Sequence, residues 1–82
     1  MKLPARFNPG DIIQRLPTRD PYDTYNKDIN KYGILTFLVM DVEYRHIYSV
    51  QKTIILYKIF CMQTEEITYV SMREKNGWKK IG

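Results

Sequence analysis

Ile34 to Tyr44, which reads ILTFLVMDVEY, and Lys52 to Gln63, which reads KTIILYKIFCMQ, are the two segments that decide the fold. Both are rich in β-branched and aromatic residues, the composition typical of strands. Neither keeps the apolar spacing of an amphipathic helix. We therefore expect two long strands, with the chain turning between them over Arg45 to Gln51.

Both segments are apolar on both of their faces over much of their length, although one apolar face is enough to line a core. Two explanations stay open. A long loop, or strong curvature of the sheet, covers the second face; or that face is an interface with a partner or a second copy of the chain. The residues that we assign to such an interface are Phe37, Val39, Leu56 and Phe60.

Shorter strands are expected on either side of the two long ones, separated by turn-forming residues. Asn8-Pro9-Gly10 and Thr64-Glu65-Glu66 are typical turn sequences, and Pro17 and Pro21 are poor members of a hydrogen-bonded ladder. The remaining elements are a first strand at Asp11 to Leu16, a loop at Pro17 to Tyr32 with one helical turn after Asp23, a fourth strand at Ile67 to Met72, a connector at Arg73 to Gly77 and a fifth strand at Trp78 to Ile81.

This order of strands and loops resembles the SH3-like small β-barrel. The opening Phe7-Asn8-Pro9-Gly10-Asp11-Ile12-Ile13 also looks like the F-x-x-G-D-hydrophobic start of many such barrels, including those of short bacteriophage and bacterial binding proteins. The resemblance implies an all-β fold, a five-stranded and partly open barrel with a long loop between strands 1 and 2. Residues 1–82 would form it as a single domain.

The composition bears on compartment and class. A single cysteine, Cys61, excludes an intramolecular disulfide framework and fits a reducing cytosol. No apolar run approaches the roughly 18–20 residues of a membrane span, and the first ten residues lack the apolar region of a signal peptide. We expect a cytoplasmic protein that does not enter a membrane.

Catalytic and metal-binding patterns are weak. His46, Cys61 and two serines offer no nucleophile with an orienting partner, and no glycine-rich phosphate loop occurs. The spacing of Asp20, Asp23 and Asp28 matches neither an EF-hand nor a zinc ligand set, so we interpret them as turn formers and cap residues. We expect no enzymatic activity, no cofactor and no metal.

Tyrosine is the residue in excess, with seven in the chain. Tyr22, Tyr25 and Tyr32 lie in the long loop, where a core role is hardest to sustain. Tyrosine is enriched at protein interfaces because it combines a large rigid ring with a polar tip. These three residues are either partner contacts or a lid over the end of the barrel, and we include them among the candidate partner-binding residues.

The net charge of +4 and the pI near 9.3 also suggest nucleic acid as a partner. On this alternative, Lys75, Lys79 and Lys80 hold a phosphate backbone while Trp78 stacks on a base. The competing interpretation is that Trp78 closes the barrel and the lysines are solvated.

The leading hypothesis is a non-enzymatic protein-binding module. Isoleucine, lysine, asparagine and tyrosine, all with AT-rich codons, make up 29 of the 82 residues, as in a low-GC bacterium or a virus infecting one. The chain resembles in type the short bacteriophage proteins of host takeover, which dock on a polymerase, replication factor or AAA+ protease. Such an adaptor, inhibitor or modulator would act in the host cytoplasm on a host bacterial protein, as a monomer or a homodimer. The alternative is a nucleic-acid-binding small β-barrel.

Overall fold

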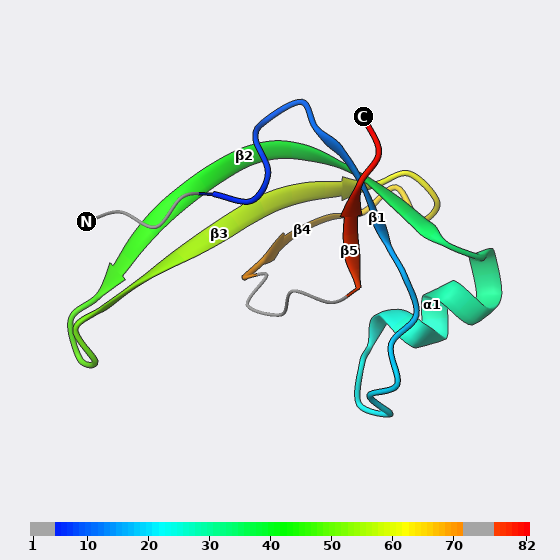
Figure 1. The fold of residues 1–82 in the computed structure, drawn as a ribbon, viewed down its shortest axis with the longest axis horizontal. Helices are drawn as coiled ribbons and strands as arrows, with labels where there is room; N and C mark the ends of the chain where they lie inside the picture. Colours follow the sequence, from blue (N-terminus) through cyan, green and yellow to red (C-terminus); the bar gives the residue numbers. More distant parts are fainter. Residues whose placement is uncertain (1–4, 72–76) are drawn as a thin grey trace.

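A long antiparallel hairpin of β2 (Leu35–Ile47) and β3 (Lys52–Cys61) is the base on which the rest of the fold is built. The computed structural model describes residues 5–71 and 77–82. Within these ranges the other strands are β1 (Ile12–Arg15), β4 (Ile67–Val70) and β5 (Trp78–Lys80). One helix, α1 (Tyr25–Tyr32), follows β1 and precedes β2 along the chain (Figure 1).

The five strands form one antiparallel sheet in the order β4-β3-β2-β1-β5. β1 to β4 follow one another as a meander, and β5 returns to pair with the free side of β1. In the part of the chain that the structure describes, β4 and β5 are the two edges and no ladder joins them. The expected five-stranded β fold is therefore confirmed in part: the strands form an open antiparallel sheet accompanied by one short helix, and the sheet does not close into a barrel.

Most strand ends differ from the expected ones by one or two residues, and two differences are larger. β2 continues through His46 and Ile47, because these residues pair with Thr53 and Lys52 of β3, so the turn is shorter than expected. Residues 25–32 of the expected loop form two turns of helix rather than one. Met72, the expected end of the fourth strand, and residues 73–76 of the expected connector lie outside the described residues.

The helix α1 buries one side chain fully, Ile29, and half-buries Tyr25 one turn before it. The helix ends at Gly33, which has φ of 83° and donates its N–H to the carbonyl of Ile29 at 2.8 Å. Because a positive φ is strained for residues with a Cβ, glycine allows the chain to leave the helix and enter β2.

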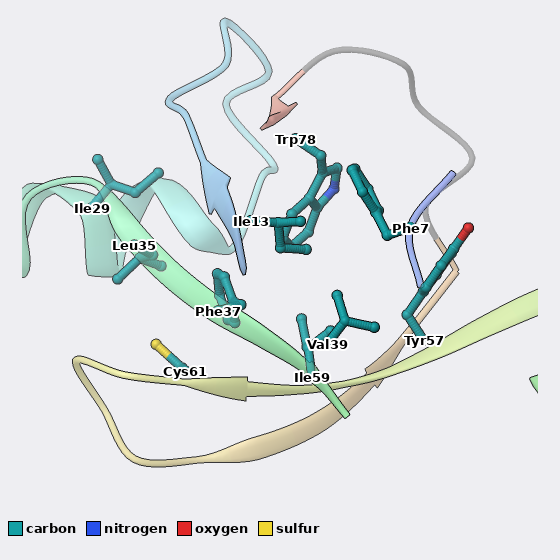
Figure 2. Close-up of a cluster of buried hydrophobic side chains, with 10 residues drawn as sticks. All are labelled: Phe7, Ile13, Ile29, Leu35, Phe37, Val39, Tyr57, Ile59, Cys61 and Trp78. Carbon is teal, nitrogen blue, oxygen red and sulfur yellow. The ribbon is translucent and has the colours of Figure 1, made fainter. Parts of the chain in front are cut away.

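The core lies on one face of the sheet, which we call the core face. Ile13, Leu35, Phe37, Val39 and Ile59 are almost inaccessible to solvent. Figure 2 shows how side chains from four strands, from α1 and from the segment before β1 converge on this face. The complete cluster is Phe7, Ile13, Ile29, Leu35, Phe37, Val39, Tyr57, Ile59, Cys61 and Trp78.

The register of β2 on β3 decides which side chains share that face. Phe37 is paired with Cys61 and Leu38 with Phe60, so Phe37 and Phe60 lie on opposite faces. A register shift between Val39 and Asp41 then changes the alternation along β2. The assignment of Phe37 and Val39 to a binding face is wrong, because the two residues are 2% and 0% exposed and lie in the core.

Gly77, just before β5, should tolerate no larger residue. Its φ is 94°, and a Cβ there would lie 2.2 Å from Nη1 of the buried Arg15. Gly10 has nearly the same φ, 93°, with no atom within 4 Å of its Cβ position. In urea unfolding we expect Gly10→Ala to cost about 1–2 kcal/mol from backbone strain alone. Gly77→Ala should cost about 1–3 kcal/mol more, because Arg15 must move. Equal losses would contradict the packing of Arg15 against Gly77.

Candidate functional site

A buried ion pair between Arg15 of β1 and Asp23 ties the long loop to the core face. The two side chains are 5% and 6% exposed, and Arg15 Nη2 donates to Asp23 Oδ2. The Thr18 hydroxyl donates to the same oxygen at 2.6 Å, and the backbone N–H of Tyr25 donates to Oδ1 at 3.0 Å. The carboxylate is thus neutralised and hydrogen-bonded on both oxygens, which buried charges require.

The surroundings of the pair also shift the pKa values of Asp23 and Tyr25. Burial alone raises the pKa of Asp23, but the hydrogen bonds from Thr18 and the Tyr25 backbone, with the Arg15 guanidinium, outweigh it and hold the pKa below its ordinary value. The pKa of the Tyr25 hydroxyl is raised, mainly by burial. At neutral pH Asp23 is therefore an anion that Arg15 balances.

Two aromatic rings complete this cluster. The Arg15 guanidinium carbon lies 5.2 Å from the ring centroid of Tyr25 and 5.0 Å from that of Trp78, within the range of cation–π contact. Both rings also contact Phe37. Trp78 is only 8% exposed, so it packs in the core and presents no face on which a base could stack. Tyr25 likewise faces the core, so its assignment to a partner surface is not supported.

Because the loop and α1 pack on the core face, they leave the opposite face of the sheet uncovered. On that outer face the register places apolar residues opposite one another: Ile12 faces Leu38, Leu38 faces Phe60, and Phe60 faces Ile67. Just past β5, Ile81 donates its N–H to the carbonyl of Ile12 at 2.8 Å and continues the line. We call these five residues the outer row.

The outer row is open to solvent, most of all at its two ends. Ile67 is 53% exposed and Ile81 is 50% exposed, whereas Ile12, Leu38 and Phe60 are half-buried by their neighbours in the sheet. Met62, which follows β3, and Tyr69 of β4 are exposed as well. Among the described residues, α1 is the one helix, and it lies on the other face. The row is therefore an apolar strip across the whole width of the sheet.

Charged side chains flank the outer row. On the same face, Lys58 lies next to Phe60 in β3 and is paired with Asp41 of β2. On the other flank, Lys79 of β5 is paired with Gln14 of β1. An apolar strip with lysines at its rim is suited to bind a protein surface, since it offers buried area together with charges that select the partner.

The other sequence-predicted residues are spread over the molecule. Leu56 lies on the outer face, opposite Glu43 and away from the row. Tyr22 is 89% exposed in the loop, and Tyr32, at the end of α1, is 45% exposed. Lys79 and Lys80 are exposed, and Lys80 Nζ lies 3.5 Å from Asp11 Oδ1. Lys75 lies outside the described residues. The structure thus brings Phe60 into the row but not the three tyrosines.

Two aspartates of the loop also accept hydrogen bonds from backbone N–H groups of the loop itself. Asp20 and Asp23 each accept the N–H of the residue two positions on, which is the expected turn-forming contact. Asp28 and Glu66 line a cavity of about 50 Å³ between α1 and the β3–β4 turn. Since one water needs about 10–15 Å³ of such space, the cavity has room for a few water molecules.

In residues 5–71 and 77–82, no three histidine, cysteine, aspartate or glutamate side chains gather where they could hold a metal ion. None of the described helices is long and apolar enough to cross a membrane. No protein-family profile, no curated protein and no solved structure matches the chain.

Removing Asp23 should destabilise the fold strongly, since it leaves the buried Arg15 without its counter-charge. We expect Asp23→Ala to cost about 3–5 kcal/mol in urea unfolding at pH 7. Asp20→Ala serves as the matched control. Its carboxylate is exposed and also accepts a loop N–H, so its loss should cost no more than about 1 kcal/mol. A similar cost for both variants would contradict a central role for the ion pair.

The same pair should give the protein an acid-sensitive component of stability. The folded pKa of Asp23 is lowered, so its contribution is complete above the unfolded pKa of about 3.9 and is lost as the pH falls through the folded value. Unfolding free energies measured between pH 7 and pH 2 should therefore drop below about pH 4. The drop should be smaller in Asp23→Ala than in the wild-type chain; identical slopes would place the acid sensitivity elsewhere.

Proposed function

We propose that this chain is a non-enzymatic protein-binding module that docks on another protein through the outer row. One observation carries the proposal: apolar side chains stand in line across β4, β3, β2 and β1 and just past β5, on a face that the loop and α1 leave open. A small domain gains nothing in folding from exposing isoleucine in this way. It gains a surface that a partner can bury.

The size of the surface fits such a role. A standard protein–protein interface buries about 800 Å² on each partner. The chain exposes 6021 Å² in total, so one face of its sheet is large enough. Full burial of an exposed isoleucine contributes about 1.5–3 kcal/mol, and the two ends of the row still have half of their surface to bury. Lys58 and Lys79 favour a partner patch that is apolar with acidic groups at its rim.

We also propose that the fold is an SH3-like arrangement of strands. The order of the strands along the chain, the return of β5 to β1 and the long connection before β2 support an SH3-like arrangement. Together with the small size and the AT-rich composition, this supports a short phage-type protein that acts on a host bacterial protein. Fold alone does not choose among such partners.

The nucleic-acid alternative requires Trp78 to stack on a base, but Trp78 is buried in this structure. Trp78 is packed against Phe37 and Tyr25, and one of the lysines beside it is near a carboxylate, with Lys80 3.5 Å from Asp11. Exposed basic residues remain, so the test below keeps nucleic acid as a measured outcome.

The double variant Ile67→Lys, Ile81→Lys should abolish partner binding without unfolding the chain. Both positions are half exposed, so each change should alter stability by no more than about 0.5 kcal/mol. Tyr22→Lys is the matched control, since it adds a lysine at an exposed aromatic residue outside the row. In pull-downs from a nuclease-treated lysate of a low-GC bacterium, a protein should be recovered with the wild-type chain and with Tyr22→Lys, but not with the double variant.

Two outcomes would overturn the proposal. One is a protein that the double variant retains and Tyr22→Lys loses, which would place the docking surface on the loop. The other is recovery of no protein, together with tight binding of single- or double-stranded DNA or RNA oligonucleotides that weakens steeply between 50 and 200 mM salt. That salt dependence would indicate phosphate contacts and a nucleic-acid function.

A further inference from the structure

The hairpin of β2 and β3 extends beyond the rest of the sheet as a two-stranded arm, formed by residues 41–47 and 52–56. The β1 ladder reaches β2 only as far as Leu38, and the β4 ladder reaches β3 only as far as Tyr57. Figure 1 shows the arm running out to its turn at the end of the molecule opposite α1. Among the described residues, each strand of the arm is therefore paired on one side only.

A long edge of this kind offers backbone N–H and C=O groups to another strand. Proteins commonly discourage such pairing with charged side chains on the edge. The β2 edge of the arm carries three exposed charges, Asp41, Glu43 and Arg45. Glu43 and Arg45, at 48% and 57% side-chain exposure, lie 3.1 Å apart. Their signs differ and they are two residues apart, so they lie on the same face of the strand. This charge pattern determines how the β2 edge can pair with the β2 edge of a second copy.

We propose that two copies of the chain associate by antiparallel pairing of their β2 edges, about a two-fold axis beside Tyr44. Identical strands that pair antiparallel are related by an axis perpendicular to the sheet, so opposed residues point to the same side. With the axis beside Tyr44, Glu43 lies opposite the partner's Arg45, and Arg45 lies opposite the partner's Glu43. Each interface then contains two opposite-charge pairs.

The charges select this register over its neighbours. An axis beside Glu43 would place Arg45 opposite the partner's Asp41 but Glu43 opposite its own copy, and an axis beside Arg45 would place Arg45 opposite its own copy. Like charges directly opposite one another destabilise a strand pair. The β3 edge of the arm offers no such match, because Lys52 is the one charged residue between Lys52 and Leu56. Of these three registers, the one about Tyr44 is the one with two opposite-charge pairs and no like charges opposed, which is the reason to assign a second copy as the occupant of the β2 edge.

The dimer is independent of the proposed docking function, yet the two are compatible. The axis is perpendicular to the sheet, so both outer rows would lie on the same side of a continuous ten-stranded sheet. A partner that is itself a symmetric oligomer could then engage two copies at once.

The test is a charge swap followed by sedimentation equilibrium. The wild-type chain should show a monomer–dimer equilibrium. Glu43→Arg and Arg45→Glu should each weaken the dimer about tenfold or more, because two attractive pairs become two repulsive ones. The double variant should restore it. An equimolar mixture of the two single variants should also restore a dimer, now heteromeric, since each supplies the charge that the other lacks.

The mixture separates this interface from a role of the pair within one chain. Each single variant has two like charges in its own strand, whether or not the other variant is in the solution. A gain in dimer on mixing can therefore come only from contacts between chains. Amide exchange over residues 41–47 should also slow as the concentration rises. A monomer up to about 1 mM, where even a weak contact of about 4 kcal/mol is half populated, would overturn the proposal. So would a dimer insensitive to both variants, or one that only Ile67→Lys, Ile81→Lys disrupts.

Discussion

The buried contact between Arg15 and Asp23 is the constraint on which the arrangement of the molecule depends. It takes a charge from the end of β1 and one from the loop and makes each necessary to the other, because neither can be left alone in the interior. Tyr25 and Trp78 both pack against the guanidinium and against each other. The loop and α1 are thereby held over the core face, and Trp78 ties β5 to the same cluster.

The second determinant is the length of the central hairpin relative to its neighbours. β2 and β3 continue well past the short strands on either side, and among the described residues no strand of the sheet pairs with the outer edges of this arm. The outer row crosses the hairpin where the short strands still pair with it, at Leu38 of β2 and Phe60 of β3. Both proposals therefore use the hairpin, but different parts of it.

The sequence was sufficient to predict the strands, since runs such as Ile34 to Val42 have no helical spacing. It was also sufficient to show that β2 and β3 had a surplus apolar face. The sequence could not show which residues lie on the surplus face, because strand register depends on partners far along the chain. Phe37 was therefore grouped with Phe60, although the two lie on opposite faces of the sheet. Arg15 resembled one more scattered charge, and only its burial reveals its role. The helix did carry a signal, as Tyr25, Ile29 and Tyr32 have helical spacing.

The central claim is that, within residues 5–71 and 77–82, nothing covers the outer face of the sheet while the core face is covered. Methyl NMR in the presence of a soluble nitroxide tests it directly, because the probe broadens only signals that solvent can reach. The methyl signals of Ile67 and Ile81 should be strongly attenuated, and those of Ile13 and Ile59, which are 0% exposed, should be unaffected. If Ile67 and Ile81 are as protected as Ile59 in the dilute protein, some other part of the chain covers the outer row and the account is wrong.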